Sequence, residues 1–452
     1  MEEKTITQFL NNELKEFAYY VLENRAIPSV IDGFKPSQRK VIHIASKTWK
    51  TGNEKILKVF QLGGKVASDA YYHHGDKSLS DTIIRMAQKF KNTTPLLEED
   101  GQFGKLRSPE AGAPRYIGTK LSPYFKMIYK DQQLLEFKEE EGEKIEPHYF
   151  LPLVPMILVN AGSGIAVGFS STILSREMND VISSCMGYLR NGRLRKTKPH
   201  INGFTGDFIQ DTENEKRWFI RGKFERINTT TVHISELPPS MTYRKYEEHL
   251  DKILEDKAIT GYDNKCKGNI NYIIKFKRNI LGSLSDDEMI KLLQLEDKVT
   301  ENFTTLNEKN KIELFDTDKE IIKYFVDFRL KYFQKRKDHI IDNIQKDIIL
   351  MSNRAKFIKL VLDKKIIINN RSKADIVKDI IKYKIPTIEN SHDYLLRTQL
   401  FALTKEMVNK LLKHIKDKEV ELKAVKKKKP KDMYMEDLET LKKEITSYEK
   451  RR

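Results

Sequence analysis

Residues 24–42, NRAIPSVIDGFKPSQRKVI, join a loop punctuated by proline and glycine to a helix rich in cations. Residues 37–48 show the three- and four-residue spacing of an amphipathic helix, with Val41, Ile42 and Ala45 on one face. A loop stiffened by proline holds cations in fixed positions, which suits contact with phosphate groups. Taken alone, however, the stretch is explained better by a solvated basic face. Its cations are Arg25, Lys35, Arg39, Lys40 and, just beyond, Lys47.

The composition indicates a soluble intracellular protein with a polyanionic partner. The 452 residues include 82 basic and 65 acidic side chains, a net charge of +17 that favours nucleic acid first and an anionic membrane second. A lysine-rich coding bias is the alternative explanation of this charge. Two cysteines in unrelated contexts, no signal peptide and no run of about 18 apolar residues predict a reducing, cytoplasmic location without membrane insertion.

The first two predicted domains differ in their pattern of elements. Residues 1–150 alternate helices with glycine-bearing loops, including a helix over residues 6–24 and another over 78–91 with Ser78 as its cap. Residues 151–315 contain apolar and alternating runs typical of strands: MILVNAGSGIAVGF, RWFIRGKF, TTTVHISELP and INYIIKFK. We therefore expect an α+β, multidomain protein.

The third predicted domain, residues 316–452, is helical. A stripe of apolar residues continues for about forty residues, longer than an ordinary globular helix, which favours a coiled-coil arm over ordinary core. A compact segment with Pro386 follows, and a second helical run is predicted to return antiparallel to the first. The lysine-rich stretch KKKKP at 426–430 interrupts that run before the stripe resumes.

Two adjacent histidines, His73 and His74, lie in the stretch YYHHGDKSLSDTIIRMAQKF at residues 71–90. Neighbouring histidines converge poorly on one ion, and no nearby cysteine or glutamate completes a ligand set. A histidine that hydrogen-bonds a phosphate or a reacting hydroxyl fits better. An ordinary structural histidine is equally compatible with this stretch.

A third stretch, DGQFGKLRSPEAGAPRYIGTKLSP at residues 100–123, places Tyr116 after Arg115 on a run of small residues and proline. Small side chains before a tyrosine allow another backbone, such as that of DNA, to come close to its ring. Its phenolate could attack phosphorus while the guanidinium stabilises the extra negative charge of the transition state. Most tyrosines only pack, so this stretch gives a hypothesis and no more.

The three stretches together resemble the breakage-reunion (gyrase A-like) subunit of type IIA DNA topoisomerases. The order RAIPxxxDGFKPxQRKV, YHHGD, QFG, PRY and PHYFLPLVPMILVNAGSGIAVGF is that of the family, and the resemblance runs through almost the whole chain. It continues at GFTGDF, ISELP, FRLKYFQKRK and YLLRTQLFALTKEMVNKL, residues 203–208, 234–238, 328–337 and 394–411. Details such as YHHGD look eukaryotic, and a eukaryotic-like core on a short separate chain resembles the medium subunits of T-even-type bacteriophage topoisomerases.

The resemblance implies a fold for each segment. Residues 1–150 match a winged-helix DNA-cleavage domain that holds the active-site tyrosine, and residues 151–315 match an α/β tower domain. Residues 316–452 match a long antiparallel coiled coil with a helical exit gate, whose dimer contacts we expect near Pro386–Leu411.

The resemblance also implies a role for four catalytic residues. Tyr116 matches the nucleophile that forms a 5′-phosphotyrosine, and Arg115 matches the arginine that stabilises the scissile phosphate. His74 matches the histidine that contacts that phosphate or the attacking hydroxyl. Arg25 matches another phosphate-contacting arginine.

Four further positions match the DNA-binding set of the family. Lys35 and Arg39 belong to its DNA-facing cations, and Lys40 stands where gyrase has a second arginine. Ile165, in GSGIAVG, matches the apolar residue that wedges between base pairs and helps to bend the duplex.

The implied activity is ATP-dependent: a staggered double-strand break, passage of a second duplex, and relaxation and decatenation of DNA. The expected partners are double-stranded DNA, a second copy of this chain and a subunit with ATPase and Toprim functions. Mg²⁺ and ATP would be bound by that subunit, because no suitable acidic triad occurs here. The cluster Glu139–Glu146 is interpreted as solvated surface. The competing hypotheses are a bacterial-type gyrase or topoisomerase IV subunit, an architectural DNA-binding protein, and a basic coiled-coil scaffold that would explain only residues 316–452.

Overall fold

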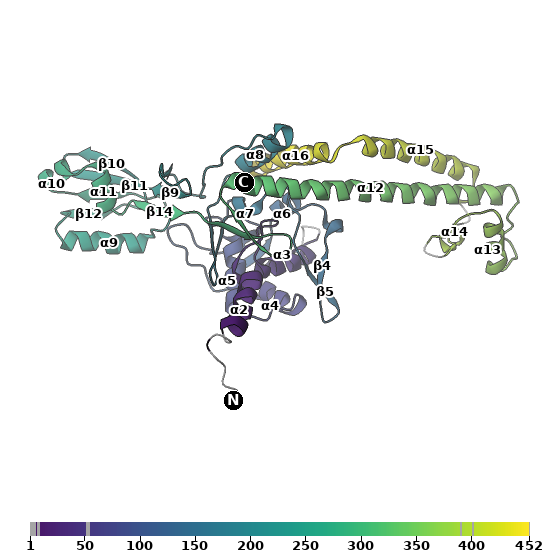
Figure 1. The fold of residues 1–452 in the computed structure, drawn as a ribbon, viewed down its shortest axis with the longest axis horizontal. Helices are drawn as coiled ribbons and strands as arrows, with labels where there is room; N and C mark the ends of the chain where they lie inside the picture. Colours follow the sequence, from purple (N-terminus) through teal and green to yellow (C-terminus); the bar gives the residue numbers. More distant parts are fainter. Residues whose placement is uncertain (1–5, 7–9, 51–54, 389–390, 400–401, 452) are drawn as a thin grey trace, which may run out of the picture. The chain divides into compact units, whose positions relative to one another are not determined.

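The computed structural model describes residues 6, 10–50, 55–388, 391–399 and 402–451 (Figure 1). The chain divides into two compact units: Met1–Arg329 with Asp437–Arg452, and Leu330–Glu436. The architecture is mixed α/β, as predicted. Within the described residues no helix is long and apolar enough to cross a membrane.

Helices α3, α4 and α5 pack together beside a small sheet in the N-terminal part of the first unit. Helix α3 begins at Pro36, whose missing N–H costs nothing in the first turn, and it buries Val41, Ile42 and Ala45 as predicted. It packs against α4 and α5, and the sheet has the antiparallel order β1-β3-β2. The elements are η1 (Leu10–Leu14), α2 (Lys15–Val21), η2 (Leu22–Ala26), α3 (Pro36–Thr48), β1 (Leu57–Lys58), α4 (Val59–Asp69), α5 (Asp76–Ala87), β2 (Leu97–Asp100) and β3 (Gly118–Leu121).

A buried carboxylate organises the loop before α3. Asp32 is fully buried and accepts hydrogen bonds from the backbone N–H groups of Phe34 and Phe150, at 3.1 and 3.0 Å. Gly33 has φ +75°, and a Cβ there would lie 2.8 Å from the backbone nitrogen of Ile157. Only glycine fits a left-handed residue so close to another backbone. The Asp-Gly-Phe sequence therefore joins the loop to the chain around residue 150.

Short hairpins and helices connect this part to the larger sheets. The segment MILV, predicted as part of a strand, is the helix α7, and only the residues after it form the hairpin β6–β7. The elements are α6 (Pro123–Ile128), η3 (Gln132–Leu134), β4 (Phe137–Glu140), β5 (Glu143–Pro147), α7 (Met156–Val159), β6 (Gly162–Ile165), β7 (Ser170–Ile173) and α8 (Met178–Asn191).

Two antiparallel sheets follow, with orders β14-β9-β8 and β10-β11-β13-β12. Alternate residues of β11, including Val232 and Ile234, are fully buried and pack with Tyr246 and Leu250 of helix α9 (Figure 1, left). The elements are β8 (Asp207–Gln210), β9 (Arg217–Arg221), β10 (Lys223–Asn228), β11 (Thr231–Glu236), α9 (Tyr243–Glu255), β12 (Gly261–Asn264), β13 (Tyr272–Lys275), α10 (Arg278–Ser283), α11 (Asp286–Leu292), β14 (Glu296–Thr300), β15 (Phe303–Leu306) and β16 (Ile312–Phe315).

The second unit consists of helices. The 45-residue helix α12 (Asp318–Leu362) confirms the long periodic stripe, and α15 (Lys405–Lys427) runs antiparallel to its second-unit part. Lys337 Nζ of α12 donates to the Lys426 carbonyl near the end of α15 at 2.9 Å. Earlier on α15, the pKa of Lys418 is raised by its hydrogen bond to Glu421 and by the charges of Glu421 and of Asp347, which lies further along α12, so the two helices run in opposite directions. A small core around Ile380 holds α13 (Lys373–Lys382) and α14 (Asp393–Leu396), and α16 (Pro430–Arg451) returns to the first unit.

Two local predictions were wrong. Helix α5 begins at Asp76 after Gly75, so Ser78 lies inside the helix and does not cap it. Glu146 is not solvated surface: it is 1% exposed, and its carboxylate lies 2.9 Å from Lys40 Nζ and 3.4 Å from Lys138 Nζ. The predicted helix over residues 6–24 and the predicted dimer segment include residues 7–9, 389–390 and 400–401, which lie outside the described residues.

Candidate active site

Tyr116 is 73% exposed on a loop whose backbone is fixed at the start of α4. The N–H groups of Phe60 and Val59 donate to the carbonyls of Pro114 and Ile117, at 3.2 and 3.0 Å. Lys58 Nζ donates to the Tyr116 carbonyl at 2.9 Å. The phenol therefore faces solvent from a backbone that three bonds hold in place, which limits the entropy lost when the ring engages a substrate.

The glycines of this loop allow close packing. Gly104 has φ +85°, and a Cβ there would lie 2.6 Å from the Pro109 carbonyl oxygen. Gln88, at the end of α5, donates to the carbonyls of Phe103 and Pro109 at 2.8 and 3.2 Å. The loop is thus attached to α5 as well as to α4.

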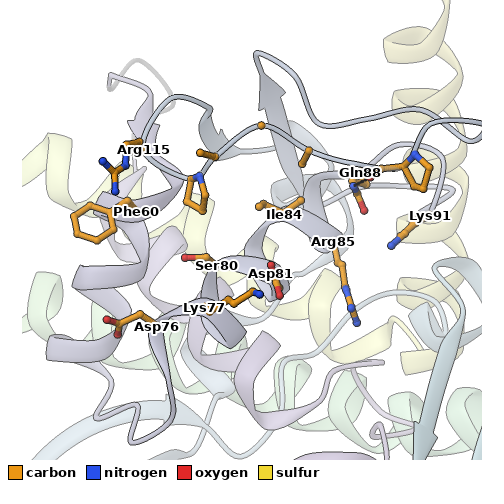
Figure 2. Close-up of a pocket in the computed structure, with 15 residues that line it drawn as sticks. Phe60, Asp76, Lys77, Ser80, Asp81, Ile84, Arg85, Gln88, Lys91 and Arg115 are labelled. Carbon is orange, nitrogen blue, oxygen red and sulfur yellow. Dashed lines mark hydrogen bonds between the residues drawn. The ribbon is translucent and has the colours of Figure 1, made fainter.

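A groove of about 480 Å³ separates α5 from residues 109–115 of the loop (Figure 2). Arg115 lies beside Phe60 at one end of this groove, and Lys91 lies at the other. The charged side chains between them come from α5: Asp76, Lys77, Asp81 and Arg85. Arg115 therefore lies at the head of a charged groove, immediately before the exposed tyrosine.

Three cations lie close enough to affect one another. Burial, and then the charge of Arg85, lower the pKa of Lys35 below its ordinary value. The same two causes lower the pKa of Lys91. Cations that lie close together favour the binding of an anion between them. The backbone of DNA has such an anion, a phosphate, at every nucleotide. The sequence prediction included Lys35 but missed Arg85 and Lys91, although both occur in or next to a helix it predicted.

Ile165 is 88% exposed at the end of strand β6, before the turn of the β6–β7 hairpin. Gly164 packs directly on the backbone of Ala26: a Cβ there would overlap the Ala26 carbonyl oxygen and lie 3.6 Å from Lys35 Nζ. Arg25, next to Ala26, is exposed. The fold thus brings together Arg25, Lys35 and Ile165, which are far apart in the sequence.

The two histidines are exposed and have different neighbours. His73 Nε2 lies 3.0 Å from a carboxylate oxygen of Glu140, whereas the ring of His74 meets Tyr72 edge-on at 5.3 Å. No described hydrogen bond joins His74 to Arg115 or Tyr116. Across the residues that the structure describes, no group of three or more histidine, cysteine, aspartate or glutamate side chains could hold a metal ion.

Arg39 and Lys40 do not fit the DNA-facing role predicted for them. Arg39 is 5% exposed, and its guanidinium donates to both carboxylate oxygens of Asp32, at 2.7 and 3.0 Å. Lys40 donates to the Ala70 carbonyl and pairs with the buried Glu146. Both cations are used inside the fold: Arg39 shapes the loop that contains Gly33, and Lys40 attaches α3 to β5.

A buried arginine attaches the tyrosine loop to the larger sheet. Arg107 donates to the Glu236 carboxylate at 2.6 Å and to the carbonyls of Leu237, Pro238 and Met241. Glu236 also accepts from the backbone N–H and hydroxyl of Thr205, at 2.9 and 2.8 Å. Burial opposes ionisation of Glu236, but the bonds from Thr205 and Arg107 outweigh it and lower its pKa. The ISELP segment thus anchors the loop that presents Tyr116.

Comparison with known proteins identifies the family of this chain. The family described as the A subunits of DNA gyrase and topoisomerase IV matches residues 25–440. A solved structure of the Plasmodium falciparum topoisomerase II DNA-binding, cleavage and re-ligation domain superposes with a TM-score of 0.84 at 31% identity, covering 98% of this chain and 66% of that one. The chain therefore belongs to the gyrase A/topoisomerase IV family of type II topoisomerases, as the sequence resemblance predicted.

Among its relatives is the DNA topoisomerase medium subunit of Enterobacteria phage T4, 31% identical over 98% of this chain and 100% of that protein. Mitochondrial DNA topoisomerase 2 of Dictyostelium discoideum is 31% identical over 100% of this chain. DNA topoisomerase 2 of Plasmodium falciparum is 32% identical over 97% of it. The chain spans 36% and 34% of the lengths of these two eukaryotic relatives.

Proposed function

We propose that this chain is the DNA-cleaving and religating subunit of an ATP-dependent type II topoisomerase. The observation that carries the proposal is the exposed Tyr116 on a fixed backbone, next to Arg115 at the head of a groove whose charged lining is four cations and two aspartates. Family membership supplies the reaction class, and the local geometry supplies the nucleophile.

The reaction is a reversible transesterification. Tyr116 Oη attacks a backbone phosphorus, a Tyr116 Oη–P bond forms, and the P–O3′ bond breaks. The phenolic proton leaves to a base, with His74 as the candidate in this chain, and the released 3′ oxygen takes up a proton. The 3′ hydroxyl later attacks the 5′-phosphotyrosine and restores the strand.

The cations of the site have two tasks. Arg115 stabilises the charge that develops on the scissile phosphate, which is the role proposed for a guanidinium beside the nucleophile. Arg25, Lys35, Arg85 and Lys91 bind flanking phosphates and fix the register of the duplex without reading its sequence. Arg39 and Lys40 support this surface from inside and are not proposed to contact DNA.

The domain roles and the dimeric arrangement are proposed by analogy with the family. Residues 1–150 act as a winged-helix domain, 151–315 as a tower and 316–452 as a coiled-coil arm with an exit gate. Two copies of the chain, related by two-fold symmetry, cut the two strands with a stagger and pass a second duplex. Relaxation and decatenation are the expected outcomes, in the host cytoplasm if a virus encodes the chain.

Mg²⁺ and ATP belong to a partner subunit in this proposal. Among the described residues, no group of three or more histidine, cysteine, aspartate or glutamate side chains could hold a metal ion. Its residues position the phosphate and supply the nucleophile, and the partner supplies the ATPase and Toprim functions.

Trapping the covalent intermediate tests the proposal. The chain is mixed with its ATPase/Toprim partner, Mg²⁺ and supercoiled plasmid, then denatured rapidly, and the nucleotide-bearing peptide is mapped by mass spectrometry. We expect cut DNA with protein on its 5′ ends, linked through Tyr116. If the chain binds DNA but forms no covalent complex, it is an architectural protein instead. Linkage of the protein to a 3′ end would rule out the mechanism.

Ile165 is proposed to wedge between base pairs and bend the duplex. The Ile165→Ala variant should fold with a stability change within about 0.5 kcal/mol, because the side chain is exposed. It should lose about 2 kcal/mol of contact with the unstacked bases, a roughly 30-fold loss of cleavage. End-to-end energy transfer on a labelled duplex reports the bend. Ile227→Ala, at an exposed isoleucine of β10, is the control, and equal bending by both variants would exclude the wedge.

A further inference from the structure

The segments Leu330–Lys337 and Leu422–Lys431 of the second unit contain four and six cations, respectively, and no acidic residue. Lys337 Nζ donates to the Lys426 carbonyl at 2.9 Å, which places the two segments side by side. The rings of Phe333 and Tyr434 stack at 4.4 Å and join α12 to α16, the helix that follows the lysine run. We call these two segments the cationic junction. None of its residues belongs to the first unit, which holds Tyr116.

The lysine run of the cationic junction is folded into two helix ends. Lys428 ends α15, with its N–H on the carbonyls of Ala424 and Val425, and Pro430 begins α16. Lys428 Nζ pairs with Glu436, so this cation has a structural role. Lys426, Lys427 and Lys429 are exposed and have no carboxylate within ion-pair distance among the residues that the structure describes. The backbone therefore presents three uncompensated cations in defined positions.

Helix capping accounts for only part of this charge. A cation in the last turn of a helix gains about 0.3–1 kcal/mol from the helix dipole, and one or two suffice. The cations Lys331 and Lys335 lie within α12, far from either end of that helix, and gain nothing from its dipole. Lys426, Lys427 and Lys429 are close in sequence, and like charges within a Debye length of about 8 Å repel one another, which costs stability. A polyanion bound to these lysines would neutralise their charges, so that the repulsion between them no longer destabilises the fold.

The surface of the cationic junction fits a duplex better than a single strand. Proteins that bind single strands combine cations with exposed aromatic rings on which bases stack. Here Tyr332, Phe333 and Tyr434 are buried, at 5%, 0% and 0% exposure. Duplex DNA carries one phosphate per about 1.7 Å of axis, so cations alone can bind it.

We propose that the cationic junction is a second binding surface for duplex DNA, separate from the one at Tyr116. This inference rests on the proposed function, because a topoisomerase must handle a second duplex besides the one it cuts. The contacts are electrostatic, independent of sequence and weak at high salt, as a surface over which a duplex moves requires.

The test compares two triple variants of the full-length chain. In the first, Lys426, Lys427 and Lys429 are changed to alanine. In the matched control, the exposed Lys410, Lys413 and Lys416 of α15 are changed to alanine, for the same loss of three positive charges outside the cationic junction. Duplex affinity is measured from about 50 to 200 mM salt, and each replaced phosphate contact should lower the salt slope by about 0.9. The first variant should lose a slope of roughly 2 to 3, and the control much less.

Strand passage gives the second readout. With the partner subunit present, the first variant should cleave a short duplex as well as the unaltered chain does but relax plasmid about tenfold more slowly. Equal salt slopes and equal relaxation for the two variants would overturn the inference, and so would loss of partner binding without loss of duplex binding. Failure of the unaltered chain to form a covalent complex would contradict the proposed function instead, while the salt slopes would still test this surface.

Discussion

Tyr116→Phe is expected to abolish covalent attachment to DNA while leaving the protein folded and able to bind a duplex. The change removes one exposed oxygen, and the backbone bonds from Lys58, Val59 and Phe60 do not involve the side chain. Removal of an attacking group typically lowers a rate by roughly 10⁴-fold or more, because binding and charge stabilisation alone remain. Cleavage of an end-labelled duplex, quenched with denaturant, measures the loss directly.

Tyr20→Phe is the matched control, since Tyr20 is also exposed but lies on α2. Its cleavage should equal that of the unaltered chain, and its duplex affinity should equal that of Tyr116→Phe. Covalent complexes in Tyr116→Phe at more than a trace would show that another residue is the nucleophile.

Arg107→Ala is expected to cost about 3–5 kcal/mol of stability, because it leaves the buried Glu236 carboxylate without its charged partner. The Arg107→Ala change should slow the cleavage step more than it weakens the affinity for duplex DNA. A displacement of about 1 Å at a reacting group can cost roughly 100-fold in rate, and Arg107 anchors the loop of Tyr116. We therefore expect an unchanged duplex affinity and a roughly 100-fold slower cleavage step.

Two variants separate positioning from general loss of stability. Arg107→Lys keeps the charge but loses the two-pronged guanidinium, so it should recover part of the cleavage rate. Arg226→Ala removes an arginine that also donates to backbone carbonyls (two, against three for Arg107) and to one carboxylate, but at α10–α11, away from the tyrosine loop. If Arg226→Ala slows cleavage as much as Arg107→Ala does, the loop is not positioned through Glu236.

The same pair predicts a pH dependence. Because the pKa of Glu236 is lowered in the folded protein, its contribution is fully present above the pKa of an unfolded glutamate, near 4.3. It is lost as the pH falls through the lower, folded value. Measured by urea unfolding, the stability difference between the unaltered and Arg107→Ala proteins should begin to shrink as the pH falls below about 4.3.

Local periodicity predicted the helices that depend on local patterns. The spacing of Val41, Ile42 and Ala45 identifies α3, and the long stripe identifies α12. Helix α4 was missed because Gly63 and Gly64 lower its intrinsic propensity, while burial of its apolar face in three dimensions stabilises it.

The sequence alone could not predict which cations of the first motif are buried and which are exposed. Arg39 and Lys35 look alike in the motif, yet Arg39 pairs with Asp32 inside the fold, whereas Lys35 is close enough to Arg85 for that charge to lower its pKa after burial has done so. Only the folded chain decides which cation has a carboxylate partner. The ISELP motif pointed to a family, and the structure assigns its glutamate to Arg107.

Gly164 limits which substitutions the β6–β7 hairpin can accept during evolution. The hairpin tip tolerates many apolar residues, because Ile165 and Val167 project into solvent. One position earlier, any side chain would collide with the Ala26 carbonyl and push the tip away from Arg25. Substitutions at the exposed tip can therefore accumulate without strain, whereas even a methyl group at position 164 would require the backbone to move.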